Sequence, residues 1–71
     1  MITLFRKISL IHAIKCDKTN DENIANRSFK KLDNLKTKIN SGENVTIEIT
    51  EWMQENPAVT EAEIKELNGG K

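Results

Sequence analysis

Residues 20–40, NDENIANRSFKKLDNLKTKIN, carry the clearest periodicity in the chain. At about 100° of rotation per residue, their apolar side chains fall on one arc, namely Ile24, Ala25, Phe29, Leu32, Leu35 and Ile39. A basic ridge lies opposite, with Arg27, Lys30, Lys31 and Lys38 beside Asn34. This pattern predicts a long amphipathic helix with one face in a core and the other toward water or a partner. Thr19, Asn20 or Asp21 would cap its start, and Gly42 would end it.

The segment before this helix is ambiguous. Apolar residues alternate at even positions, namely Ile2, Leu4, Ile8, Leu10 and Ile14. This alternation and the β-branched content favour a β-strand, although short apolar runs do not distinguish a strand from a helix. We therefore expect residues 1–15 to form a strand or a helix. A strand would make the fold α+β and would need a partner, such as a second copy of the chain.

The segment after the helix also has two interpretations. Val45, Ile47 and Ile49 alternate with polar residues as in a strand. A helix is the alternative, with Thr46 as its N-cap and helical spacing of Ile49, Trp52, Met53 and Asn56. The dipeptide Asn56-Pro57 would end it, because the residue before proline disfavours the helical region.

The last element is well defined by its ends. Thr60 and Glu63 have the spacing of a capping box, and Val59 and Ile64 that of a hydrophobic staple. Asn68-Gly69-Gly70 would stop the helix after Leu67.

The run Ile49–Pro57 followed by Val59–Leu67 resembles the first two helices of bacterial winged-helix regulators. The resemblance implies a helix at residues 47–56. It implies no DNA contact by this end, because Glu61, Glu63 and Glu66 would face phosphates. The sequence as a whole therefore predicts a mainly α fold: a single small domain over residues 1–71, with a long central helix and a C-terminal helix pair.

Composition limits the chemistry that we expect. A chain of 71 residues is short for an independent core, and the single Cys16 excludes an internal disulfide. Regular helix packing or a homodimer would then supply stability. His12 and Cys16 are the only soft metal ligands, and no phosphate-binding glycine loop is present. We predict no metal, no cofactor and no enzymatic activity, and no membrane partner. We expect a cytoplasmic protein.

The charges are divided unequally along the chain. Nine bases and four acids give residues 1–40 a net charge of +5, and two bases and seven acids give residues 41–71 a net charge of −5. The two halves either attract each other or serve a partner. Besides the basic ridge, a candidate partner surface is the acidic stripe, formed by Glu48, Glu51 and Glu55 with Trp52 beside them.

These features favour a protein that acts through surface complementarity. The leading hypothesis is a small regulator or inhibitor that docks on a larger cellular protein, of the type encoded by phages and mobile elements. The alternative is a nucleic-acid-binding regulator that uses the basic ridge, as a dimer.

Overall fold

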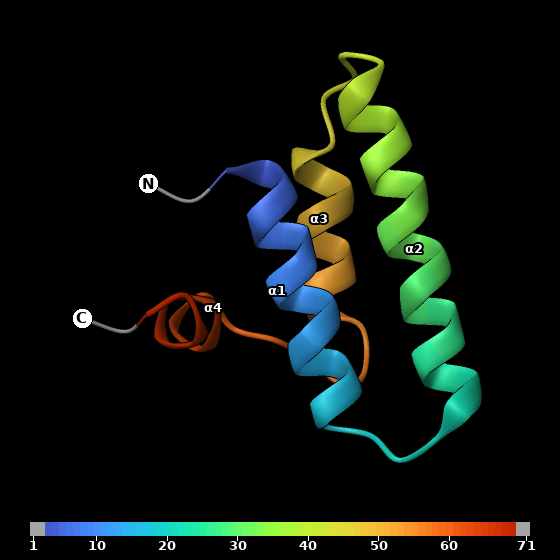
Figure 1. Ribbon diagram of the computed structural model, residues 1–71, viewed down its shortest axis with the longest axis vertical. Helices are drawn as coiled ribbons and strands as arrows, with labels where there is room; N and C mark the ends of the chain where they lie inside the picture. The colour runs from blue at the N-terminus through green and yellow to red at the C-terminus, as the bar shows by residue number, and fades with distance from the viewer. Residues whose placement is uncertain (1–2, 70–71) are drawn as a thin grey trace.

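The computed structural model describes residues 3–69, which form four helices and no strand (Figure 1). They are α1 (Leu4–Asp17), α2 (Glu22–Asn40), α3 (Thr46–Gln54) and α4 (Glu61–Leu67). In Figure 1, α2 runs antiparallel to α1 and α3, and α4 is seen nearly end-on at the far side of α1 from α2. The mainly α prediction is thus confirmed.

Of the two interpretations of residues 1–15, the helix is confirmed from Leu4 onward and the strand is wrong there, whereas residues 1–2 lie outside the described residues. Thr3 caps α1 by accepting a hydrogen bond from the Arg6 backbone N–H at 3.1 Å. The helix buries Ile8, Ile11 and Lys15, which have the spacing of one helical face. Leu10 and Ile14 are buried as well, because α2 and α4 both pack on α1. The buried arc of α1 is therefore broad, and its apolar residues do not form the single narrow stripe that identifies a helix in a sequence.

The long central helix forms as predicted, with a correction to its apolar face. Asp21 is the N-cap and accepts from the Asn23 backbone N–H at 2.8 Å, and Gly42 follows the helix with φ +81°. Leu32 and Leu35 are buried, but Phe29 is 59% exposed. Ser28 is buried instead, so the buried arc of α2 is displaced by about one residue from the predicted one.

Both short C-terminal helices are present. The strand interpretation of residues 45–50 is wrong, since they enter α3. Thr46 is the first residue of α3 and not its N-cap, because its N–H is already bonded to the Asn44 side-chain oxygen at 3.0 Å. The capping box of Thr60 and Glu63 is confirmed at the start of α4.

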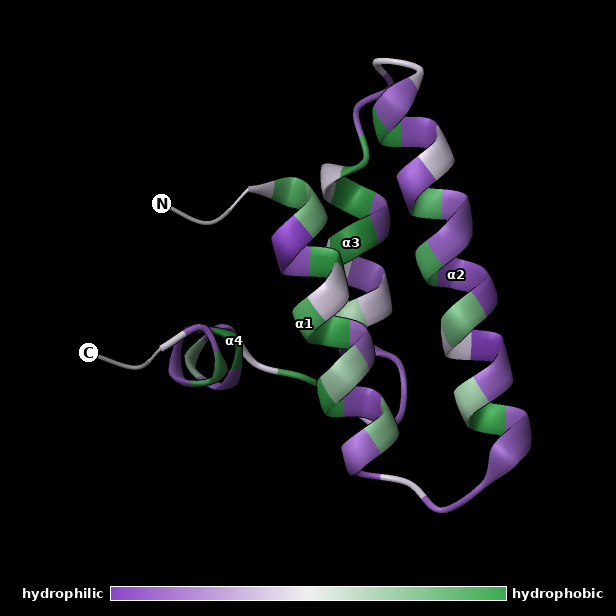
Figure 2. Ribbon diagram, in the orientation of Figure 1, coloured by the Kyte–Doolittle hydropathy of each residue, from purple (hydrophilic) through white to green (hydrophobic). Residues whose placement is uncertain are grey.

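The buried apolar side chains form one core around α1. The backbones of α2 and α4 approach α1 closely, whereas α3 reaches the core mainly through large side chains. Figure 2 shows α1 as largely hydrophobic, α2 as largely hydrophilic and α3 as a mixture of both. The core residues are Ile8, Leu10, Ile11, Ile14, Leu32, Leu35, Val45, Ile49, Trp52, Met53, Val59 and Ile64.

Two substitutions in α2 test which of its residues belong to the core. Leu35→Ala removes a side chain with no exposed surface, so we expect a loss of about 2–5 kcal/mol in the free energy of unfolding. Phe29→Ala should cost about 1 kcal/mol or less, because most of the ring is in solvent. Urea unfolding followed by circular dichroism measures both. Equal losses in the two variants would contradict the observed orientation of α2.

Candidate functional site

The opposite charges of the two halves meet within the fold. Each of the four ion pairs among residues 3–69 joins a lysine of the first half to a glutamate of the second half. The nitrogen–oxygen distances are 2.8 Å for Lys7–Glu61, 2.7 Å for Lys18–Glu63, 4.0 Å for Lys31–Glu48 and 2.8 Å for Lys38–Glu48. The charge asymmetry therefore serves internal pairing to a large extent, although each exposed pair contributes little to stability.

The four residues of the acidic stripe do not share one environment: one is ion-paired, one is buried and two are exposed. The Glu48 carboxylate accepts two hydrogen bonds from Lys38, at 2.8 and 2.9 Å, which lower the pKa of Glu48 and raise that of Lys38. Trp52 is only 2% exposed and belongs to the core. Glu51 and Glu55 remain exposed. A continuous acidic surface with an aromatic centre is thus not formed.

The basic ridge is also divided. Lys31 and Lys38 turn toward Glu48 of α3, and both are half-buried. Arg27 and Lys30 are exposed and make no ion pair with any residue in the range 3–69. Of the basic ridge, Arg27 and Lys30 are therefore the two residues that offer a partner charge left unpaired within the described residues.

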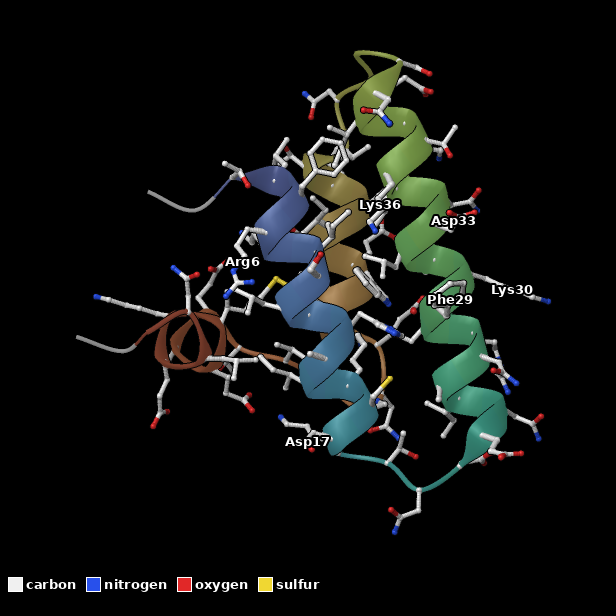
Figure 3. All side chains as sticks on the ribbon, in the orientation of Figure 1. Arg6, Asp17, Phe29, Lys30, Asp33 and Lys36 are labelled. Carbon is white, nitrogen blue, oxygen red and sulfur yellow. The ribbon has the colours of Figure 1, made fainter. Side chains whose placement is uncertain are left out.

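Phe29 is the residue that sequence reasoning placed most misleadingly. Its ring meets the His12 ring edge-on, with 5.9 Å between centroids and 66° between planes. Figure 3 shows Phe29 on the side of α2 turned to the viewer, with Lys30 and Lys36 on the same helix. Phe29 and Lys36 are seven residues apart, which places them on one helical face. We call Phe29, Lys36 and His12 the Phe29 face.

His12 and Cys16 lie one helical turn apart on α1, and their contact is now defined. Cys16 Sγ lies 3.7 Å from His12 Nε2 and 3.8 Å from Nδ1. His12 Nδ1 is hydrogen-bonded to the buried Ser28 hydroxyl at 2.8 Å, a partner that the sequence did not suggest. Burial, with a smaller effect of the Lys36 charge, lowers the pKa of His12 below its ordinary value of 6.5. The arrangement holds a neutral imidazole between α1 and α2.

Lys15 is the second residue that the sequence did not single out. Lys15 is only 3% exposed. Its ammonium donates hydrogen bonds to the backbone carbonyl oxygens of Glu55 at 2.8 Å and Pro57 at 2.9 Å. It also lies 6.0 Å from the centroid of the Trp52 ring. Burial lowers the pKa of Lys15, and the Glu55 carboxylate opposes this shift. The only sequence signal was its position on the stripe of Ile8 and Ile11.

A cleft of about 320 Å³ opens where Lys15, α2 and the end of α3 meet. Its floor includes the buried Lys15 and Trp52, and the turn after α3 forms one wall. The side chains that α2 contributes are mostly polar or cationic. The full lining consists of Lys15, Ile24, Arg27, Ser28, Lys30, Lys31, Asn34, Trp52, Glu55, Asn56 and Pro57.

Within residues 3–69, no group of three or more His, Cys, Asp or Glu side chains is arranged to hold a metal ion. No helix in that range has the length and apolar character needed to cross a membrane. Comparison with protein-family models, with characterised proteins and with solved structures gives no match. Function is therefore argued from the geometry.

The His12 environment predicts a pH effect on stability. Its folded pKa lies below the unfolded value, so the unfolded chain takes up a proton first as pH falls. We expect the wild type to lose stability as pH falls through 6.5 toward the folded pKa, and His12→Gln to lack this contribution. Urea unfolding across this range tests the difference, and NMR titration of this single histidine gives its pKa directly. A titration midpoint at or above 6.5 would refute the assignment.

Proposed function

We propose that this protein is a small non-enzymatic regulator or inhibitor that docks on a larger cellular protein, of the type encoded by phages and mobile elements. The observation that supports this proposal most directly is the exposed Phe29. The Phe29 side chain is 59% exposed and lies outside the buried core, whereas Leu32 and Leu35 of the same helix are buried in it. Exposed aromatic residues are frequent anchors of protein interfaces, where a partner pocket removes them from water.

The surroundings of Phe29 specify the partner further. The edge-on contact with His12 restricts the ring, so that less conformational entropy is lost when a partner covers it. Lys36 lies two turns along the same face and Asp33 lies one turn along it, so the ring has one charge of each sign beside it. The complementary surface would therefore be an apolar pocket with charged residues of both signs around its rim.

Affinity capture from a bacterial lysate tests this proposal with a matched pair of variants. Phe29→Ala and Ile47→Ala each shorten an exposed apolar side chain, on α2 and on α3 respectively. We expect the wild type and Ile47→Ala to retain one stoichiometric protein, and Phe29→Ala to lose it, because only Phe29 lies on the proposed face. Mass spectrometry identifies the captured protein.

Two outcomes would contradict this proposal. One is the recovery of no stoichiometric protein partner by the wild type. The other is equal capture by Phe29→Ala and the wild type, which would remove the Phe29 face from the interface.

A nucleic-acid-binding regulator, acting as a dimer, is the second candidate. The exposure of Phe29 favours it, because proteins that bind single-stranded nucleic acid combine an aromatic stacking surface with nearby cations. Arg27 and Lys30 would supply phosphate contacts. Lys31 and Lys38 are less suitable, since both are engaged with Glu48.

Electrophoretic mobility shift with single-stranded and double-stranded DNA and RNA separates the two candidates. Nucleic-acid binding predicts an affinity that falls steeply between about 50 and 200 mM salt. It also predicts loss of binding in the double variant Arg27→Glu, Lys30→Glu, whereas Lys65→Glu on α4 should bind normally. No shift at low salt, or equal shifts for both variants, would contradict this candidate.

A further inference from the structure

The cleft between α2 and the turn after α3 is lined mainly by cationic side chains, and the proposed docking function does not account for it. Four of its lining side chains are cationic, namely Lys15, Arg27, Lys30 and Lys31, and one is anionic, Glu55. Asn34 adds a neutral side-chain donor, whereas the Ser28 hydroxyl is already hydrogen-bonded to His12 and Lys31 lies 4.0 Å from Glu48 outside the cleft. We infer that this cleft binds a small phosphate monoester, whose negative charges the remaining excess of cations would neutralise.

Lys15 makes this cleft more than a group of surface cations. Its ammonium has three N–H donors, of which two bind the carbonyl oxygens of Glu55 and Pro57. The third donor has no partner among the described residues, and the side chain lines the cleft although its residue is 97% buried. A buried cation fixed by two backbone carbonyls needs little rearrangement to bind an anion.

The other lining residues indicate the rest of the ligand. The Arg27 guanidinium presents a fork of donors that suits phosphate oxygens. Ile24, Trp52 and Pro57 add apolar surface for a small organic group. The volume of about 320 Å³ lies at the lower end of ligand pockets, which span about 300–1,000 Å³. This size suits a metabolite rather than a nucleic-acid duplex.

This inference does not depend on the proposed docking function, since Phe29 does not line the cleft. The residues that α2 contributes to the cleft lie on a different side of the helix from Phe29 and Lys36. Loss of the docking proposal would therefore leave the cleft assignment intact, and the reverse also holds.

Titration of the labelled protein by NMR, at constant ionic strength, tests the cleft with defined probes. Phenyl phosphate carries two negative charges and a planar ring, phenyl sulfate has the same shape with one charge, and inorganic phosphate lacks the ring. We expect phenyl phosphate to bind most tightly and to shift the Trp52 indole N–H and the amides of Ser28 and Asn34. Trp52 is a clear reporter because it is the only tryptophan in the chain.

Variants connect the binding to the cleft. Arg27→Gln should weaken phenyl phosphate binding by about tenfold, because it removes one charge-assisted contact. Lys65→Gln makes the same change in charge on α4, outside the cleft, and should bind as the wild type does. Both positions are exposed, so both variants should fold.

Several results would overturn the inference. They are the absence of binding at about millimolar phenyl phosphate, equal affinity for phenyl sulfate, and unchanged affinity in Arg27→Gln. A short single-stranded oligonucleotide could also shift the same resonances of Trp52, Ser28 and Asn34. If it bound more tightly than phenyl phosphate, the cleft would be assigned to a nucleic-acid site instead.

Discussion

Burial of the Lys15 ammonium is the constraint that links the two halves of the molecule. A lysine that leaves water must find hydrogen-bond acceptors. The acceptors come from Glu55 and Pro57, about 40 residues away, in the turn that joins α3 to α4. The direction in which the chain leaves α3 is thus fixed by one side chain of α1. The neighbouring Lys18 reinforces this arrangement from the surface, with its Nζ 2.7 Å from the Ala58 carbonyl oxygen.

The sequence was informative where the signal is local. The long helix, the Gly42 terminator and the capping box of Thr60 and Glu63 all depend on residues within one or two turns, and all three are confirmed. The choice between strand and helix for residues 1–15 depended on distant contacts instead. Both α2 and α4 pack on α1, and Lys15 is buried there because carbonyl oxygens about 40 residues away accept hydrogen bonds from its ammonium. No local pattern records these contacts.

The candidate site shows the same limit. The unequal charges of the two halves were visible in the sequence, but the choice of Glu48 as the common partner of Lys31 and Lys38 depends on how α2 packs beside α3. Phe29 was assigned to the core because the apolar residues of a helix show roughly which side is buried. They do not fix the exact rotation of the helix about its own axis. Ser28 takes the inward position, since the His12 ring offers it a hydrogen bond at 2.8 Å. A rotation of this size moves an aromatic ring from the interior to the surface.

The position of α4 has a consequence for how the molecule opens. This short helix approaches α1 and not α2, and its links to α1 include Lys7–Glu61 and the Arg6–Asn68 hydrogen bond, both at the surface. Ile64 is its one buried residue within Glu61–Leu67. Separation of α4 would expose Ile64 and the part of α1 that α4 covers, and it would leave the α1–α2 contact in place. Amide hydrogens of α4 should exchange with solvent through such local opening, well before those of α1 and α2 do so through global unfolding.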